Sequence, residues 1–142
     1  MPENDLESTV GASVTGLILT ARAWLAAEPD DDIRAELSEL IDAAEGGDAD
    51  ELAERFDGRL QFGTAGLRAA VAAGSMRMNR LVVRQAAAGL GRWLLDAEAS
   101  GDIVDAAKRG VVIAHDARRK SDAFADDTAR VLAAMGIRSM LH

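Results

Sequence analysis

The feature that most constrains this fold is a strand-like run, an amphipathic segment and a second strand-like run near the C-terminal end. The first run, Val111 to Ala114, is continuously apolar, as expected of a strand that is covered on both faces. A polar loop from Asp116 to Lys120 precedes the amphipathic segment. That segment ends at Gly136, a residue type that commonly follows helix ends, and residues 137–141 form the second run. This order predicts a parallel, right-handed βαβ unit in an α/β fold.

Two helices of this region can be placed by their periodicity. A long helix should extend to about Ser100 after an opening residue at Ser75 or Asn79. The helix between the two runs should begin with Ser121 as its N-cap. The predicted buried stripes are Val82, Ala86, Leu90, Trp93 and Ala97 in the first helix, and Phe124, Thr128, Val131 and Met135 in the second. Arg80 and Arg84 are expected on a solvated face.

The first 58 residues predict three helices without catalytic chemistry. Pro29 and the aspartates that follow it separate the first helix from the second, and Gly46-Gly47 ends the second. A third, short helix should run from about Asp48 to Phe56. The predicted packing stripes are Val10, Val14, Leu17, Ala21 and Leu25 in the first helix, and Ile33, Leu37, Leu40, Ile41 and Ala44 in the second.

The pattern changes near Gly58. Residues 59–62 and 67–71 predict two short strand-like pieces joined by a glycine-bounded turn. The predicted fold class is therefore α/β, with an acidic helical N-terminal extension over residues 1–58. A βαβ-type mixed-sheet domain, incomplete in this chain, is expected over residues 59–142.

Composition excludes several classes of function. The chain has 142 residues, 49% of them hydrophobic and 28% charged, which fits an ordinary globular domain. It has no cysteine, which excludes disulfides and thiolate chemistry, and its two histidines make no convincing metal site. Aromatic content is only 4%, which leaves little for base stacking, so we expect no nucleic-acid partner.

The apolar stretch from Val10 to Ala27 is interpreted as a helix of a cytoplasmic protein, not as a signal peptide or membrane anchor. Its N-terminal flank carries acidic residues where a signal peptide needs positive charge, and Arg22 interrupts it. Charge is also divided along the chain. Residues 1–58 hold 16 acidic and 3 basic side chains, whereas residues 59–142 hold 8 acidic and 13 basic ones. The basic segment suits a small anionic ligand.

The turn Gly63-Thr64-Ala65-Gly66, followed by Arg68, is the first candidate site. Two glycines around a hydroxyl residue allow the backbone to turn tightly and direct N–H groups at an anion. Arg68 would add a planar fork of donors that matches phosphate oxygens. From these residues alone, a structural turn beside a surface arginine is at least as good an interpretation.

The second candidate is the segment from His115 to Ser121. It lies at the carboxyl end of a predicted strand and before a helix N-terminus, where open α/β sheets bind ligands. Arg118 and the two cations after it would favour a phosphate. Asp116 acting as a turn cap, with solvated cations around it, is the alternative interpretation, and on the residues alone it is the stronger one.

These two segments together resemble the α-D-phosphohexomutase family, and most closely its phosphoglucomutase and phosphopentomutase branch. The run from Arg59 through Phe62-Gly63-Thr64-Ala65-Gly66-Leu67-Arg68 matches the opening of that branch. Val112 to Arg118 is similar to the family's strand ending in Gly-Tyr-Asp-x-Arg. The region around Trp24 to Arg34 resembles the branch's helical extension. Departures are Ala114, His115 and Arg80, which stand where glycine, tyrosine and aspartate are usual.

The resemblance implies a four-domain enzyme in which a phosphoserine passes its phosphoryl group to a sugar phosphate through a bisphosphate intermediate. It implies Mg²⁺ held by an Asp-Gly-Asp-Gly-Asp loop and a hexose bisphosphate that serves as intermediate and activator. Both the serine and the metal loop are expected beyond His142, so no catalytic or metal-binding residue is predicted in this chain. The predicted substrate-binding residues are Thr64, Gly66, Arg68 and Arg118.

The favoured hypothesis is the N-terminal part of a mutase that interconverts hexose 1- and 6-phosphates, or pentose 1- and 5-phosphates, in carbohydrate metabolism. The chain ends in what resembles an unfinished strand, and by itself it should be inactive. Expected partners are a phosphorylated sugar and the remaining domains of the full-length protein, with no membrane. The alternative is a non-catalytic sugar-phosphate or anion-binding module. A structural pairing domain comes third.

Overall fold

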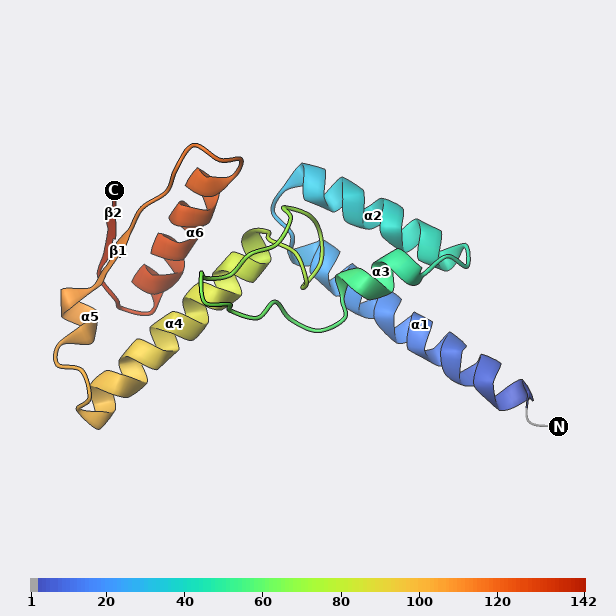
Figure 1. Ribbon diagram of the computed structural model, residues 1–142, viewed down its shortest axis with the longest axis horizontal. Helices are drawn as coiled ribbons and strands as arrows, with labels where there is room; N and C mark the ends of the chain where they lie inside the picture. The colour runs from blue at the N-terminus through green and yellow to red at the C-terminus, as the bar shows by residue number, and fades with distance from the viewer. Residues whose placement is uncertain (1–2) are drawn as a thin grey trace. The chain divides into compact units, whose positions relative to one another are not determined.

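The computed structural model describes residues 3–142, with side chains from residue 13 onward. Contacts divide the chain into two compact units, Met1–Asn79 and Arg80–His142, and Figure 1 labels their elements. The segment 59–79 therefore packs with the helices that precede it. The domain boundary predicted after residue 58 stays a prediction.

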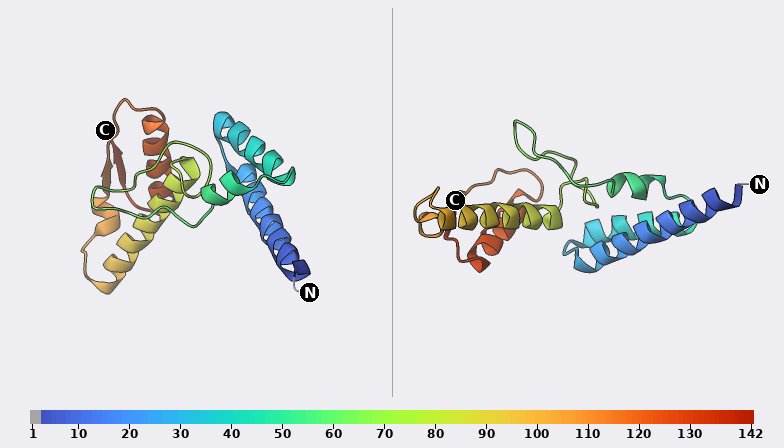
Figure 2. Two further views of the ribbon diagram at one scale, coloured as in Figure 1. Left: turned by 45° about the vertical axis from the view of Figure 1, so that its right-hand side comes forward. Right: turned by 90° about the horizontal axis from the view of Figure 1, so that it is seen from below.

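The first unit contains the three predicted helices: α1 (Glu3–Ala27), α2 (Asp31–Glu45) and α3 (Asp50–Arg55). The break at Pro29 and the end of α2 at Gly46 follow the sequence prediction. Asp31 and Asp32 occupy the first turn of α2, where negative charge favours the helix dipole. Figure 2 shows α1 and α2 running side by side.

The core of the first unit lies between these helices. The predicted α2 stripe is confirmed, except that Leu40 is only partly buried, and Val10 of the α1 stripe lies outside the described side chains. Trp24 of α1 meets Phe56 edge-to-face, with ring centroids 5.6 Å apart. The buried residues of this core are Ala21, Ile33, Leu37, Ile41, Ala44, Leu52 and Ala73. Because Ala73 is among them, the end of the following loop is part of the helical core.

Residues 59–79 form a long irregular loop, so the prediction of two strand-like pieces is wrong. The loop contains only isolated bridges, between Gly63 and Gly66 and between Val71 and Met78. Neither predicted piece has a neighbouring strand along its length in the described chain, and an extended segment needs such a partner to become a strand. In Figure 2 the green part of this loop extends away from the three helices of its own unit.

The second unit contains α4 (Arg80–Ser100), α5 (Ala106–Arg109), β1 (Val111–Ile113), α6 (Ser121–Ala134) and β2 (Ser139–Leu141). The strands pair in parallel, with Val112 opposite Met140 and Ile113 opposite Leu141. The predicted order of strand, helix and parallel strand is thus confirmed. Gly136, in the left-handed region at φ +79°, follows α6 as predicted.

The buried face of α4 differs from the prediction. Of the predicted stripe, Val82 is buried as expected, but Leu90 and Trp93 are 41% and 60% exposed. Ala87 and Gly91, which were not in that stripe, are buried. The reason is the close approach of α6: a Cβ built on Gly91 would lie 2.6 Å from Sδ of Met135. The helices meet where the side chain is smallest, and the bulky side chains point elsewhere.

Three further predictions in this unit are corrected. Lys120, in the left-handed conformation, is the N-cap of α6, and Ser121 is its first residue. The predicted α6 stripe is only partly buried, and the buried residues are Ala125, Asp127 and Leu132. β1 is not covered on both faces in this chain, because Val112 is 68% exposed while its neighbour Ile113 is buried.

No helix among the described residues combines the length and apolar character needed to cross a bilayer.

Candidate functional site

The turn at Gly63–Gly66 forms at the tip of the long loop in the first unit. The two glycines exchange backbone hydrogen bonds, with Gly63 N to Gly66 O at 3.0 Å and Gly66 N to Gly63 O at 3.2 Å. Gly66 has φ +100°, a conformation that residues with a side chain rarely adopt. The local sequence therefore closes a tight turn and places Thr64 and Ala65 at its exposed end.

Several donors near this turn have no acceptor among the described residues. Within the part of the chain that the structure describes, neither the Thr64 hydroxyl nor the Arg68 guanidinium makes a hydrogen bond or ion pair, and both side chains are exposed. The amides of Thr64 and Ala65 likewise donate to no described acceptor. Unpaired N–H groups and a guanidinium on one short loop can bind an anion.

The loop is closed below this tip by contacts that we call the neck. Ser75 joins its two sides, since the Ser75 hydroxyl donates to Gly58 O at 2.6 Å and the Leu60 amide donates to Ser75 O at 3.3 Å. Asn79 is fully buried, and its side-chain amide donates to the carbonyls of Ala72 and Gly74 at 2.9 and 2.8 Å. The tip is therefore carried on a compact base.

The second candidate segment is arranged around Asp116, just after β1. Its Oδ1 accepts hydrogen bonds from the Arg118 amide and the Ser121 hydroxyl, each at 3.0 Å. Its Oδ2 accepts a hydrogen bond from Arg118 Nε at 2.8 Å. The hydrogen bonds from Arg118 N–H and Ser121 lower the pKa of Asp116 from its ordinary value. Asp116 thus organises the turn, as the alternative interpretation expected.

Arg118 is an exposed but partly engaged cation. Its side chain is 85% exposed, and one edge of the guanidinium faces Asp116. The terminal nitrogens have no acceptor among the described residues, so the side chain retains donors for an anion. Thr64, Gly66 and Arg68 share one loop of the first unit, whereas Arg118 belongs to the second unit.

The most buried charge in the second unit was not predicted. Asp127 of α6 is 2% exposed and accepts hydrogen bonds from Arg80 Nε at 2.7 Å and Arg84 Nη2 at 3.0 Å. The prediction that both arginines lie on a solvated face is therefore wrong. The available signal was an acidic residue among the apolar positions of a helix, because a buried carboxylate requires a cation.

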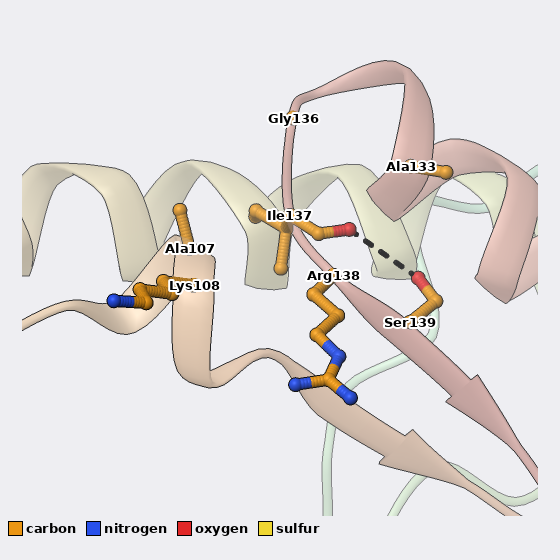
Figure 3. Close-up of a pocket in the computed structure, with 7 residues that line it drawn as sticks. All are labelled: Ala107, Lys108, Ala133, Gly136, Ile137, Arg138 and Ser139. Carbon is orange, nitrogen blue, oxygen red and sulfur yellow. Dashed lines mark hydrogen bonds between the residues drawn. The ribbon is translucent and has the colours of Figure 1, made fainter.

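Figure 3 shows a pocket in the second unit whose lining residues belong to neither candidate segment. Its lining residues are Ala107, Lys108, Ala133, Gly136, Ile137, Arg138 and Ser139. This pocket adjoins the start of β2, whereas the Asp116 turn follows the end of the parallel strand β1. Ligands of open α/β sheets bind at carboxyl ends, so the pocket lies at the less favourable edge and contains no predicted site residue.

The described residues contain no cluster of three or more histidine or carboxylate side chains that could hold a metal ion. The Mg²⁺ implied by the resemblance therefore has no fitting ligand set in this part of the chain.

The sequence that forms both candidate segments matches a known protein family. A family model described as phosphoglucomutase/phosphomannomutase, alpha/beta/alpha domain I, matches residues 59–142, more than half of the chain. The matched range includes both the Gly63–Gly66 turn and the Asp116 turn. No solved structure matches the chain.

Curated relatives carry mutase names. A probable phosphoribomutase of Schizosaccharomyces pombe is 42% identical over 116 residues, covering 82% of this chain and 18% of the relative. A phosphopentomutase of Homo sapiens is 42% identical over 72 residues, covering 51% and 11%. A phosphoglucomutase of Staphylococcus saprophyticus is 40% identical over 86 residues, covering 61% and 14%. The chain thus spans less than a fifth of each of these relatives.

Proposed function

The chain belongs to the phosphoglucomutase/phosphomannomutase family, and from that membership we propose that it is the N-terminal part of a sugar-phosphate mutase. In this proposal the loop tip with Thr64, Gly66 and Arg68 binds a phosphorylated sugar. The observation that carries it is the group of donors at that tip for which the described part of the chain offers no acceptor. Arg118 is proposed as a further phosphate donor from the turn after β1.

The chemistry of such a site follows from charge. Phosphoryl transfer spreads negative charge over the phosphoryl oxygens, and a protein lowers the barrier by positioning and by donors aimed at those oxygens. Arg68 offers a planar fork that can engage two oxygens at once. The Thr64 hydroxyl and the amides at the turn add neutral donors that would fix the orientation of the same group.

The catalytic serine of the complete enzyme is proposed to lie outside this chain. There a phosphoserine would transfer its phosphoryl group to the sugar phosphate, and the bisphosphate so formed would return its other phosphoryl group. Mg²⁺ would neutralise phosphate charge, with its ligands also outside this chain. The relatives bear phosphoribomutase, phosphopentomutase and phosphoglucomutase names, which supports hexose or pentose phosphates as the substrate class.

The test uses the product of the complete coding sequence in a mutase assay with glucose 1-phosphate and ribose 1-phosphate. Loss of a charge-assisted hydrogen bond costs about 1.5–3 kcal/mol, so Arg68→Ala should lower kcat/KM roughly 10- to 100-fold. The matched control is Arg92→Ala, an exposed arginine on α4 paired with Asp96, which should leave kcat/KM unchanged. An inactive wild type, or equal activity of the Arg68 and Arg92 variants, would refute the proposal.

A second candidate is a module that binds sugar phosphates without catalysis. The unpaired donors favour it, because they belong to the first unit and need no residue from outside this chain. Titration of the 142-residue chain with glucose 1-phosphate distinguishes the two functions. Binding that is lost in Arg68→Ala, together with an inactive complete product, would favour the module.

A further inference from the structure

Glu54 of α3 pairs with Arg77 of the loop at 2.7 Å, and the carboxylate of Glu36 of α2 makes a second contact, at Ala73. Glu36 of α2 accepts a hydrogen bond on Oε2 from the Ala73 amide at 3.1 Å. Its Oε1 accepts a hydrogen bond from Arg55 Nη1 at 2.6 Å, and that nitrogen also donates to Ala73 O at 3.2 Å. Both backbone groups of Ala73 are thereby bonded to residues of the helical extension.

The backbone of Arg55 fits against the same part of the loop. Its carbonyl accepts a hydrogen bond from the Met76 amide at 3.1 Å. A Cβ on Gly74 would lie 2.5 Å from that carbonyl oxygen, and Gly74 has φ +108°. Only glycine allows this approach, so the loop and the end of α3 are matched in shape.

Above the neck the tip has few other attachments. Between residues 61 and 69 the hydrogen bonds are the Gly63–Gly66 pair and one from the Gln61 side chain to Arg59 O. Phe62 is 71% exposed and packs into no core. The direction in which the tip presents Thr64 and Arg68 is therefore set at the neck.

We propose that Glu36 and Arg55 are positioning residues that aim the Gly63–Arg68 tip at the sugar phosphate. The helical extension, predicted to carry packing faces alone, thereby contributes to substrate binding. This inference rests on the function proposed above for the tip. This partly buried pair suits the role. Burial opposes the charge of Arg55, but hydrogen bonds to Glu36 and Glu51 and the charges of these two residues outweigh it and raise the pKa of Arg55.

The first measurement is amide hydrogen exchange of the 142-residue chain. Glu36→Ala removes both acceptors and should speed exchange of the hydrogen-bonded amides of this loop, those of Leu60, Gly63, Gly66, Ala72 and Ala73, at least about tenfold, because the loop opens locally more often. Exchange in α4 and α6 should not change. The control is Glu45→Gln, also on α2, which removes an exposed ion pair with Arg22 of α1.

The second measurement is kcat and KM of the complete product below its thermal transition. A misplacement of about 1 Å can cost up to about a hundredfold, so Glu36→Ala should lower kcat/KM roughly 10- to 100-fold. Glu36→Gln, which keeps one acceptor, should recover part of the loss. In an Arg68→Ala background the effect of Glu36→Ala should disappear, because residues that act together are not additive.

The outcomes separate the two claims. If Arg68→Ala impairs activity while Glu36→Ala changes neither the amide hydrogen exchange of the tip nor kcat/KM, the positioning inference alone fails. If Glu36→Ala only lowers the melting temperature, Glu36 is structural and the inference is again wrong. If the wild-type product is inactive and binds no sugar phosphate, the proposed function fails and this inference fails with it.

Discussion

Arg80 and Asp127 form a buried ion pair that joins the first turn of α4 to the middle of α6. Arg80 Nε donates to Oδ2 at 2.7 Å and Arg80 Nη2 donates to Oδ1 at 3.0 Å, so the contact is bidentate. Arg84, one helical turn later, donates to the same carboxylate. Two arginines thus compensate one buried charge, and their contacts with it join α4 to α6 within the second unit.

Replacement of Asp127 should strongly destabilise the second unit. Breaking a buried ion pair by removing one partner costs about 3–5 kcal/mol, because the remaining charge stays uncompensated. Asp127→Ala should therefore lower the urea midpoint of the 142-residue chain, followed by circular dichroism. The control is Asp126→Ala, one residue earlier and paired with Arg130 on the exposed surface, which should cost about 1 kcal/mol or less. Equal losses of unfolding free energy in both variants would show that Asp127 contributes no more to stability than an exposed aspartate.

The carboxylate of Asp127 should also make the free energy of unfolding decrease at acid pH. Burial raises the pKa of Asp127, but the hydrogen bonds and charges of Arg80 and Arg84 outweigh it and hold the pKa below its ordinary value. A lowered pKa contributes stability above the unfolded value of about 3.9, and that stability is lost as pH falls through the folded pKa. The free energy of unfolding should thus decrease below about pH 4, and Asp127→Asn should flatten this decrease. A parallel acid slope in wild type and variant would contradict the assignment.

Gly110 should tolerate no side chain. It has φ +76°, and an added Cβ would lie 2.3 Å from Arg138 O, next to the pairing of β1 with β2. Gly101 has a similar φ of +85° with open space around it, so Gly101→Ala isolates the backbone strain of about 1–2 kcal/mol. Gly110→Ala should cost clearly more than Gly101→Ala in chemical denaturation. If the unfolding free energies of the two variants agree within error, the strands must move apart to accommodate the added methyl group at no cost in stability, and the prediction is wrong.

The elements that sequence predicted well are those specified by local pattern. Pro29, the acidic first turn and Gly46 delimit α2, and the glycine at position 136 ends α6. The Gly63–Gly66 turn was also predicted, because glycine permits the positive φ that Gly66 adopts there. Each of these signals lies within a few residues of the structure that it specifies.

The features that sequence missed depend on contacts far apart in the chain. The buried face of α4 was assigned from Leu90 and Trp93 because large apolar side chains usually fill cores, yet Gly91 allows α6 to approach on another face. Asp127 meets Arg80 and Arg84 across more than 40 residues, and Glu36 meets Ala73 across 37. The periodicity of residues within one helix does not indicate which other helix will supply the partner of a buried charge.

The loop tip is held by few contacts, so the residues on which folding of the loop depends differ from the residues that the loop exposes. Folding depends on the neck, where Gly58, Ser75 and Ala73 are bonded, while the exposed residues between them contribute little to the core. Exchange of the exposed side chains at positions 64, 65 and 68 should therefore cost almost no folding free energy. These positions are open to variation as long as the hydrogen bonds at the base of the loop are kept.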